Sequence, residues 1–377
     1  MSEWLEMILK DLVAFVVDNR GKTPPVSSFG YELLEVNAIS SDRRTPDYSK
    51  VRKFVSEETY NSWFRKGHPE PGDILVPTVG TIGNVALVQE SRGAIAQNLI
   101  GLRFKKNVDS RFIYYYLSSP IGKDLMISFD IGGVQPSIKV PHLLDMKISL
   151  PPLSEQQSIG AILSCLDDKI DLLHRQNKTL EAMAETLFRQ WFIEEAQEDW
   201  EEGKVEDLFV LQRGYDLPIQ NRVDGKYPIF AASGFSGGHA EYKVTAPGVT
   251  TGRSGLIGKV YFIQDDFWPL NTSLYIKEFK KGTPLFSYFF LKTMDLESFN
   301  AGSAVPTLNR NHVHESSISI PPDKLIKEFE FHMMPNFKKL RANEIQIRTL
   351  EKLRDNLLPK LMSGEVRVSY EQGEFAS

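Results

Sequence analysis

The stretch Ser154–Phe192, SEQQSIGAILSCLDDKIDLLHRQNKTLEAMAETLFRQWF, decides the fold of this chain. Its apolar residues recur at alternating steps of four and three, which is the heptad pattern of a helix that packs along a second helix. They are Ile159, Leu163, Leu166, Ile170, Leu173, Leu180, Ala184, Leu187 and Trp191. Asn177 interrupts the pattern. It either sets the register of the pairing or marks a solvent-exposed part of the seam. At about 1.5 Å per residue, the predicted helix spans roughly 55 to 60 Å.

The partner helix is predicted to lie in the same chain. A shift of 170 residues matches Pro151-Pro152 with Pro321-Pro322, Gln176 with Gln346, Leu180-Glu181 with Leu350-Glu351, and Leu187 with Leu357. The preceding residues also repeat, with an offset that drifts from 196 to 170: Asp11-Leu12 matches Asp207-Leu208, Gly80 and Gly83 match Gly255 and Gly258, and Gly132, Pro136 and His142 match Gly302, Pro306 and His312. The chain is therefore predicted to be a tandem repeat of a globular segment of about 150 residues and a long helix. Antiparallel pairing of the two helices would carry the globular segments to opposite ends.

Each globular segment has the pattern of mixed helices and strands. Pro71-Gly72-Asp73 is a turn into an apolar strand, and RFIYYYLSS at 111–119 predicts an amphipathic helix. The predicted fold class is α+β, with two mixed α/β domains in tandem pseudo-repeat joined by two long helices that form an antiparallel coiled coil. The predicted boundaries are 1–150 for the first domain, 151–194 for the first long helix, 195–320 for the second domain, 321–366 for the second long helix, and 367–377 for a C-terminal strand and tail. Ser154 is the predicted N-cap of the first helix, and Pro335 predicts a kink or restart in the second.

Composition is that of an ordinary globular protein. With 377 residues, of which 41% are hydrophobic, the chain is long enough for two or three domains with cores. No run approaches the ~20 apolar residues of a membrane helix, and the N-terminal MSEWLEMILKDL does not resemble a signal peptide. We therefore expect a cytoplasmic protein with no membrane contact. Cys165, the single cysteine, lies beside the helix seam and is expected to be a small core residue in a reducing compartment.

Net charge neither establishes nor excludes nucleic-acid binding. The value of −5 argues against a general nucleic-acid binder. However, six acidic residues crowd the segment after the first helix: Glu194, Glu195, Glu198, Asp199, Glu201 and Glu202. Without them the net charge would be +1. Such a run is usually a solvated linker, and the sharper alternative is a segment that points away from phosphate or toward a basic protein partner.

The sequence contains no specific catalytic pattern. Asp266 with Glu278-Phe279-Lys280 resembles the carboxylates and lysine of a metal-dependent nuclease, but the matching Arg103-Phe104-Lys105 lacks the carboxylate. The run 252–260 has the wrong glycine spacing for a phosphate loop. His142 and His312 have no companions at the spacing of a metal site. We therefore expect no catalytic residue, no metal and no cofactor.

Several segments resemble the DNA specificity (S) subunit of Type I restriction-modification enzymes. They are Leu150–Gln156 (LPPLSEQ) and Leu187–Phe192 (LFRQWF) at the two ends of the first helix, Leu357–Val368 (LLPKLMSGEVRV), and, in the globular parts, Pro71–Leu75 (PGDIL) and Gly252–Val260 (GRSGLIGKV). The resemblance covers essentially the whole chain. One departure is that the second helix opens PPDKLIKEFE and lacks the Glu-Gln pair of the first.

The resemblance implies a non-catalytic adaptor. In that family, two target recognition domains each bind one half of a bipartite, asymmetric site on double-stranded DNA, and the helix pair sets the gap between the halves. Two modification (methyltransferase) subunits dock along the helices, carry S-adenosylmethionine and methylate adenine N6. Restriction subunits join them to cleave unmethylated DNA. The target recognition domains would be residues 1–150 and 195–320 of this chain.

Glycine-spaced turns are the expected DNA-binding elements, because they let backbone amides approach phosphate while neighbouring polar side chains reach base edges. The predicted DNA-binding residues are Arg20, Lys22, Thr78, Thr81 and Lys139 in the first domain, and Arg213, Tyr215, Arg253, Ser254, Asn309 and Arg310 in the second. Arg253 and Arg310 are the best candidates of this set.

Three alternatives stay open. The chain is a specificity protein of a related phage-defence or methylation-only system, or a coiled-coil scaffold that binds two protein ligands without DNA, or an autonomous nuclease. The polar residues of the two matching domains differ, which argues against the scaffold. A salt-dependent DNA shift would decide between the scaffold and a DNA reader.

Overall fold

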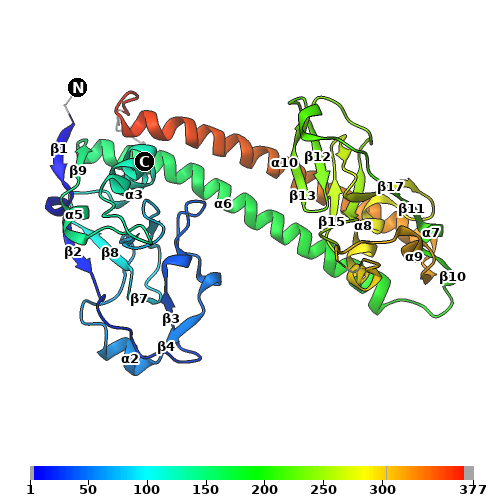
Figure 1. Ribbon diagram of the computed structural model, residues 1–377, viewed down its shortest axis with the longest axis horizontal. Coiled ribbons are helices and arrows are strands. Elements are labelled where there is room, and N and C mark those ends of the chain that lie inside the picture. The colour runs from blue at the N-terminus through cyan, green and yellow to red at the C-terminus, as the bar shows by residue number, and fades with distance from the viewer. Residues whose placement is uncertain (1–3, 303, 369–377) are drawn as a thin grey trace, which may run out of the picture. The chain divides into compact units, whose positions relative to one another are not determined.

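The computed structural model describes residues 4–302 and 304–368, and the chain divides into two compact units. Unit 1 consists of Met1–Leu172 together with Ile347–Ser377, and unit 2 is Leu173–Gln346. Two long helices, α6 (Leu153–Arg189) and α10 (Asp323–Met362), contribute residues to both units. Each unit therefore combines one globular segment with part of both long helices (Figure 1).

The globular segment of unit 1 is built from short strands and helices. In chain order these are β1 (Leu5–Ile8), α1 (Leu9–Leu12), β2 (Val13–Val17), β3 (Tyr31–Leu34), η1 (Val36–Ala38), η2 (Tyr48–Lys50), β4 (Lys53–Val55), α2 (Glu57–Ser62), β5 (Ile74–Pro77), β6 (Ala86–Leu87), β7 (Ala94–Ile95), β8 (Leu99–Phe104), α3 (Ser110–Ser118), α4 (Pro120–Ser128), α5 (Val140–Leu144) and β9 (Lys147–Leu150). The larger sheet has the order β2-β8-β5-β6, and the smaller has the order β4-β3-β7. A separate antiparallel pair joins β1 to β9.

The globular segment of unit 2 follows the turn η3 (Gln190–Glu194), a short π-helix that continues α6. Its elements are β10 (Glu201–Lys204), α7 (Val205–Leu208), β11 (Phe209–Arg213), η4 (Ile219–Asn221), β12 (Tyr227–Ala231), β13 (Gly234–His239), β14 (Gly248–Gly252), β15 (Val260–Ile263), β16 (Trp268–Pro269), β17 (Ser273–Phe279), α8 (Pro284–Thr293), η5 (Leu296–Phe299), α9 (Arg310–His314) and β18 (Ser317–Ile320). The sheets are β11-β17-β14-β15, β13-β12-β16 and the pair β10-β18.

The two units share one topology, which confirms the tandem repeat of mixed α/β domains. Each sheet of unit 1 has a counterpart of the same strand order in unit 2, including the parallel pairs β3-β7 and β12-β16. The register agrees too, because Leu5 lies opposite Leu150 and Glu201 lies opposite Ile320. Among the described residues, the first copy is longer because the connection from β3 to β4, which contains η1 and η2, is longer than that from β12 to β13, and because α2 and α4 have no α-helical counterpart in unit 2.

Within each unit, α6 and α10 pack antiparallel, as the heptad pattern predicted. In unit 2, Asn177 of α6 meets Asn343 of α10, and the Trp191 ring meets the Phe329 ring at a centroid distance of 6.1 Å. In each unit, side chains of both α6 and α10 also pack into the core of the globular segment. In unit 1, Ile159 and Leu361 share a core with Phe112 of α3. In unit 2, Phe188, Phe329 and Phe337 share a core with Phe286 and Phe289 of α8.

The polar interruption at Asn177 is paired rather than simply exposed. The Asn343 side chain is fully buried, and its Nδ2 donates a hydrogen bond of 2.8 Å to Oδ1 of the half-buried Asn177. A buried amide pair of this kind favours one register over its neighbours, because any slip would separate the two amides inside an apolar seam.

Two local predictions, and part of a third, were wrong for identifiable reasons. Ser154 is not the N-cap of α6, because the helix already begins at Leu153. Cys165 is exposed rather than buried, since it lies two residues after the seam residue Leu163 and so projects from the other side of the helix. The helix α10 continues through Pro335 without the restart, and the kink stays a prediction. The carbonyl that loses its donor there belongs to Phe331, whose 76% exposed side chain marks the solvent side of the helix.

The predicted C-terminal strand lies mostly on residues 369–377, outside the described residues. Arg367 and Val368 are described and do not form a strand. No helix in the described part of the chain combines the length and apolar character needed to cross a membrane.

Candidate nucleic-acid interface

Each unit carries a glycine-spaced turn directly after a strand of its larger sheet. The turn 78–83 (TVGTIG) follows β5, and the turn 253–258 (RSGLIG) follows β14. Gly80 and Gly83 have φ angles of 87° and 91°, and Gly255 and Gly258 have φ angles of 90° and 91°. These angles lie in the left-handed region, which glycine adopts without the strain a side chain brings. The two turns therefore have the same backbone shape.

A second loop closes over each turn with matching hydrogen bonds. In unit 1, Val79 forms an isolated bridge with Ser137, and the Gly80 amide donates to the Pro136 carbonyl at 2.8 Å. The counterparts in unit 2 are the bridge of Ser254 with Thr307 and the bond from the Gly255 amide to the Pro306 carbonyl at 2.9 Å. The glycines and prolines that recur in the sequence are thus the residues that hold turn and loop together.

One side-chain oxygen shapes each of these second loops. Oδ1 of Asp130 accepts hydrogen bonds from the amides of Gly132 at 3.1 Å and Ser137 at 2.8 Å. In unit 2, Oδ1 of Asn300 accepts from the amides of Gly302 at 3.0 Å and Thr307 at 2.9 Å. Asp and Asn both suit this role, because each offers a carbonyl-type oxygen at the same distance from its backbone. The two units therefore present the same backbone scaffold.

Unit 1 brings three of its five predicted DNA-binding residues to this scaffold. Thr78 and Thr81 belong to the turn, and Lys139 follows Ile138, whose amide donates to the Thr78 carbonyl at 3.0 Å. Thr81 and Lys139 are exposed, but Thr78 is only 1% exposed. Thr78 therefore serves the turn through its backbone rather than through its side chain.

The other two residues, Arg20 and Lys22, are exposed in the loop that follows β2. This loop is tied to the same region, because Gln97 Nε2 donates to Thr23 Oγ1 at 2.6 Å. The next residue, Asn98, accepts a hydrogen bond of 2.7 Å at its carbonyl from the first amide of the turn. All five predicted residues of unit 1 thus lie on connected loops.

A side-chain network connects the predicted residues of unit 2. Nη2 of Arg213 donates to both carboxylate oxygens of Asp216, at 3.0 and 3.1 Å. The Asn271 amide also donates to Asp216, and Nη1 of Arg253 donates to the Asn271 carbonyl at 3.3 Å. Arg213 at the end of β11 and Arg253 in the turn after β14 are therefore connected through one carboxylate and one asparagine.

The start of α9 joins the same turn. The Leu308 amide donates to the Arg253 carbonyl at 2.8 Å, which brings Asn309 and Arg310 beside the turn that contains Ser254. Asn309 caps α9 through its side-chain oxygen, while Arg310 is exposed.

The Tyr215 side chain is less accessible for a contact with DNA than its place beside Arg213 in the sequence suggests. It is half-buried, and its hydroxyl lies 2.9 Å from the hydroxyl of Tyr275 on β17. This contact holds the Tyr215 side chain against β17, and its DNA-binding role stays a prediction.

Two of the predicted arginines are already paired with carboxylates. Arg20 donates two hydrogen bonds of 2.8 Å to Asp18, and this pairing lowers the pKa of the Asp18 carboxyl below its ordinary value. Arg213 pairs with Asp216 through Nη2 alone. These acids orient the guanidinium groups, and any contact of Arg20 or Arg213 with a phosphate must share or replace them.

Sequence reasoning missed Asp216 and Asn271. The signal for Asp216 was its closeness in sequence to Arg213. Asn271 had no comparable signal, because only the corner between β16 and β17 brings it to Arg253. Val134, at the tip of the loop of unit 1, was also missed, although its side chain is fully exposed. An apolar residue next to two glycines in a predicted loop was the signal for it. In the described residues, no group of three or more His, Cys, Asp or Glu side chains is placed to hold a metal ion.

Residues 1–182 and 197–349 match the family model of the Type I restriction modification DNA specificity domain. These two ranges contain both glycine-spaced turns. The chain therefore belongs to the family of Type I restriction-modification specificity subunits, whose function is DNA recognition.

Individual relatives agree with this assignment. The Type I restriction enzyme MjaIX specificity subunit of Methanocaldococcus jannaschii is 26% identical over 338 residues, which is 79% of this chain and 78% of the relative. The MjaVIII specificity subunit of the same organism is 30% identical over 188 residues, covering 48% of this chain and 43% of the relative. The crystal structure of a Type I S subunit from M. genitalium matches with a TM-score of 0.65 at 18% identity, covering 95% of this chain and 96% of the other. This structural match confirms the fold.

Proposed function

We propose that each globular segment of this chain binds one half of a bipartite site on double-stranded DNA within a Type I restriction-modification complex. One observation carries the proposal. The two units have the same backbone hydrogen bonds around the turn and its loop, but different side chains at the matching positions. Thr78, Thr81, Lys139 and Val140 of unit 1 correspond to Arg253, Leu256, Asn309 and Arg310 of unit 2. A constant scaffold with exchanged side chains suits two domains that read different base sequences.

The predicted DNA-binding residues divide into two roles in this proposal. Those whose side chains are exposed or half-exposed contact phosphates and base edges: Arg20, Lys22, Thr81, Lys139, Arg213, Arg253, Ser254, Asn309 and Arg310. Thr78 and Tyr215 position the backbone instead, because one is buried and the other is engaged with Tyr275. Arginine pairs well with the O6 and N7 atoms of guanine, so Arg253 and Arg310 are the proposed base readers.

The long helices have a separate role. We propose that they set the distance between the two half-sites and dock two modification subunits, while restriction subunits join the full complex and this chain contributes no catalytic residue. The length and continuity of α6 and α10 support a fixed spacing, since neither helix breaks between its ends. The domain boundaries proposed are those expected from the sequence, and the complex would work in the cytoplasm.

The test uses the complex of this chain with its modification subunits and a pool of random DNA duplexes. Selected duplexes should share two short half-site sequences at a fixed separation. Arg253→Ala should weaken binding to that site by about 1–3 kcal/mol and reduce the base preference in one half-site only. Lys277→Ala is the matched control, because Lys277 is an exposed cation on β17, beyond the residues of that strand that pair with β14. Unchanged selection by the Arg253 variant would remove Arg253 from the interface.

The alternatives give different results in the same experiment. A coiled-coil scaffold without a DNA function would select no sequence and would show no salt-dependent affinity. A methylation-only system would select the same two half-site sequences. Mapping of methylated adenines in the host genome would find these sequences, but the DNA would not be cleaved.

A further inference from the structure

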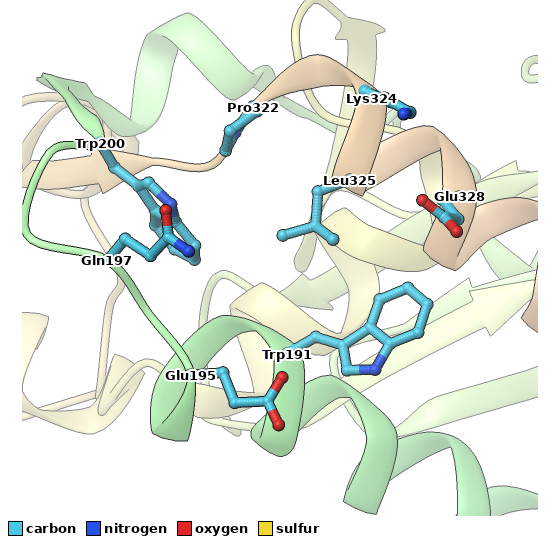
Figure 2. Close-up of a pocket in the computed structure, with 8 residues that line it drawn as sticks. All are labelled: Trp191, Glu195, Gln197, Trp200, Pro322, Lys324, Leu325 and Glu328. Atoms are coloured by element: carbon cyan, nitrogen blue, oxygen red, sulfur yellow. The ribbon is translucent and has the colours of Figure 1, made fainter.

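A cavity of about 360 Å³ lies in unit 2, between the end of α6 and the start of α10. Figure 2 shows the rings of Trp191 and Trp200 on two sides of an open space, with Leu325 beside it and Glu195 and Glu328 at its edge. Gln197, Pro322 and Lys324 complete the lining. The cavity is well separated along the chain from the turns described above.

The repeat places a matching site in unit 1, where the chain fills it from within. Trp200 corresponds to Trp4, Leu325 to Glu155 and Gln197 to Arg367. In unit 1, Nε and Nη2 of Arg367 donate to the two carboxylate oxygens of Glu155 at 2.6 and 2.7 Å. The guanidinium carbon of Arg367 lies 5.7 Å from the centre of the Trp4 ring. An arginine side chain is therefore the group that this site accepts in unit 1.

The C-terminal segment of unit 1 also covers its tryptophan. Gly364 has a φ angle of 74°, and a Cβ added there would lie 3.6 Å from Cε2 of Trp4. The residue that corresponds to Gly364 in unit 2 is Glu194, and both Glu194 and Gln197 are exposed. Unit 2 therefore lacks the internal arginine and keeps an open space beside its own tryptophan.

The charge around the cavity favours a cation. Glu195 and Glu328 are exposed carboxylates at its edge, and the exposed Glu194, Glu198 and Asp199 adjoin it in the sequence. The one basic lining residue, Lys324, directs its ammonium group away from the Trp200 ring in Figure 2. A guanidinium group can stack on an indole ring and pair with a carboxylate at the same time, which a lysine ammonium does less well.

We propose that this cavity binds an arginine side chain of a protein partner, with its guanidinium group on Trp200 and paired with Glu328 and Glu195. The arginine would take the place in unit 2 that Arg367 takes in unit 1. The identity of the partner rests on the proposed function, because we assign it to the modification subunit that docks on the long helices. The proposal also gives a reason why the second helix lacks the Glu-Gln pair at its start. Leu325 stands at the position of Glu155, and without the ion pair of Glu155 and Arg367 the space beside the tryptophan stays open.

The chemistry of the cavity can be tested on the full chain without a partner. The probe is N-acetyl-arginine methylamide, and the readout is the set of indole N–H signals in ¹⁵N NMR spectra. Saturable shifts are expected for Trp191 and Trp200, with Trp4 unchanged. N-acetyl-norleucine methylamide, which has an alkyl chain and no charge, should bind at least about tenfold more weakly. Equal binding of the two probes, or no shift with the arginine probe, would overturn the proposal.

Assembly with the modification subunits provides the second test. Glu328→Gln, and a Gln197→Arg/Leu325→Glu variant that rebuilds the ion pair of unit 1, should each weaken assembly about tenfold or more. Glu202→Gln, an exposed carboxylate on β10, is the matched control and should assemble normally. If the original chain assembles and the rebuilt variant assembles equally well, this inference fails while the proposed function stands. If the original chain does not assemble with modification subunits, the proposed function itself fails.

Discussion

The two units differ in the side chains that they bury at one equivalent position, where the globular segment meets the long helices. These side chains are polar in unit 1 and apolar in unit 2. In unit 1 the Tyr115 hydroxyl donates to Asp167 Oδ2 at 2.6 Å, and Nη1 of Arg354 donates to Asp167 Oδ1 at 2.9 Å. The residues that correspond to Tyr115, Asp167 and Arg354 in unit 2 are Phe289, Phe337 and Ala184. There the Phe289 and Phe337 rings meet edge to face at 5.9 Å, and Ala184 is fully buried.

The comparison teaches that one topology tolerates either a polar or an aromatic junction. A buried ion pair gains little net stability over well-packed apolar residues, because desolvation of the charges offsets their attraction. It is nevertheless sensitive to the loss of one member. Burial, reinforced by the charge of Asp167, raises the pKa of the Tyr115 hydroxyl, so Tyr115 remains a proton donor. The aromatic junction depends instead on the volume that its rings fill.

The largest expected effect is that of Asp167→Ala in unit 1. Removal of the carboxylate leaves the Tyr115 hydroxyl without its acceptor and leaves Arg354 with Asp355 as a partner, at a cost of about 3 kcal/mol in the free energy of unfolding. Phe337→Ala, at the matched position of unit 2, should lose a similar amount through the cavity it leaves. Urea titration measures both, with Asp171→Ala on the exposed side of α6 as the control. A loss below about 1 kcal/mol for Asp167→Ala would contradict the polar junction.

Transfer of the aromatic junction into unit 1 sharpens the comparison. The triple variant Tyr115→Phe/Asp167→Phe/Arg354→Ala removes Asp167 and Arg354 together, so neither charge is left without the other, and Arg44 keeps its ion pair with Asp168. Its free energy of unfolding should stay within about 2 kcal/mol of the original chain. If the triple variant is as unstable as Asp167→Ala, the two junctions are not interchangeable and the comparison fails.

A pH dependence should distinguish the two units at His314. The Leu211 amide donates to Nε2 of the buried His314 at 2.8 Å, whereas the corresponding residue of unit 1 is Leu144. Burial lowers the pKa of His314 below its ordinary value of 6.5. The folded chain then keeps a neutral imidazole while the unfolded chain takes up a proton below that value. The free energy of unfolding should therefore fall as the pH drops from 7 to 5, by at most about 1.4 kcal/mol per pH unit.

The measurement is a series of urea titrations across that pH range. His314→Leu, which copies unit 1, should flatten the pH dependence, and His312→Ala on the exposed side of α9 is the control. An unchanged slope in the His314 variant would show that the pH dependence arises elsewhere.

The smallest effect is expected at the amide pair of the helix seam. Asn177→Ile/Asn343→Leu gives each position the residue of its counterpart, Ile347 and Leu173. Because both amides are removed together, the free energy of unfolding should be unchanged or rise by about 1 kcal/mol. Thermal unfolding in parallel with the single variant Asn343→Leu measures this, and a lower stability of the double variant than of the single would argue against the pairing.

The sequence was sufficient to predict the tandem repeat, the two long helices and their antiparallel pairing. The heptad spacing of α6 and the recurring prolines and glycines depend only on local pattern and on the similarity of the two copies. Partners that are distant in sequence were not predictable. Asp167 and Arg354 are 187 residues apart, and each resembles a solvated charge on a helix until the fold brings them together.

The candidate site was predicted to a similar extent. The glycines located the two turns, because their left-handed φ angles follow from residue type and spacing. The sequence did not reveal that Thr78 is buried or that Asn271 and Asp216 connect two arginines, since these facts depend on the corners between strands.

Unit 1 is assembled from both ends of the chain, which has a consequence for biosynthesis. Unit 2 is one continuous segment, Leu173–Gln346, and all of it has been synthesised before Ile347–Ser377 is made. Translation of unit 1 therefore starts first, but its core is completed last, because that core includes Leu361 and Met362. A stop codon shortly after Gln346 would spare the later-made half and leave the earlier-made half with an open core.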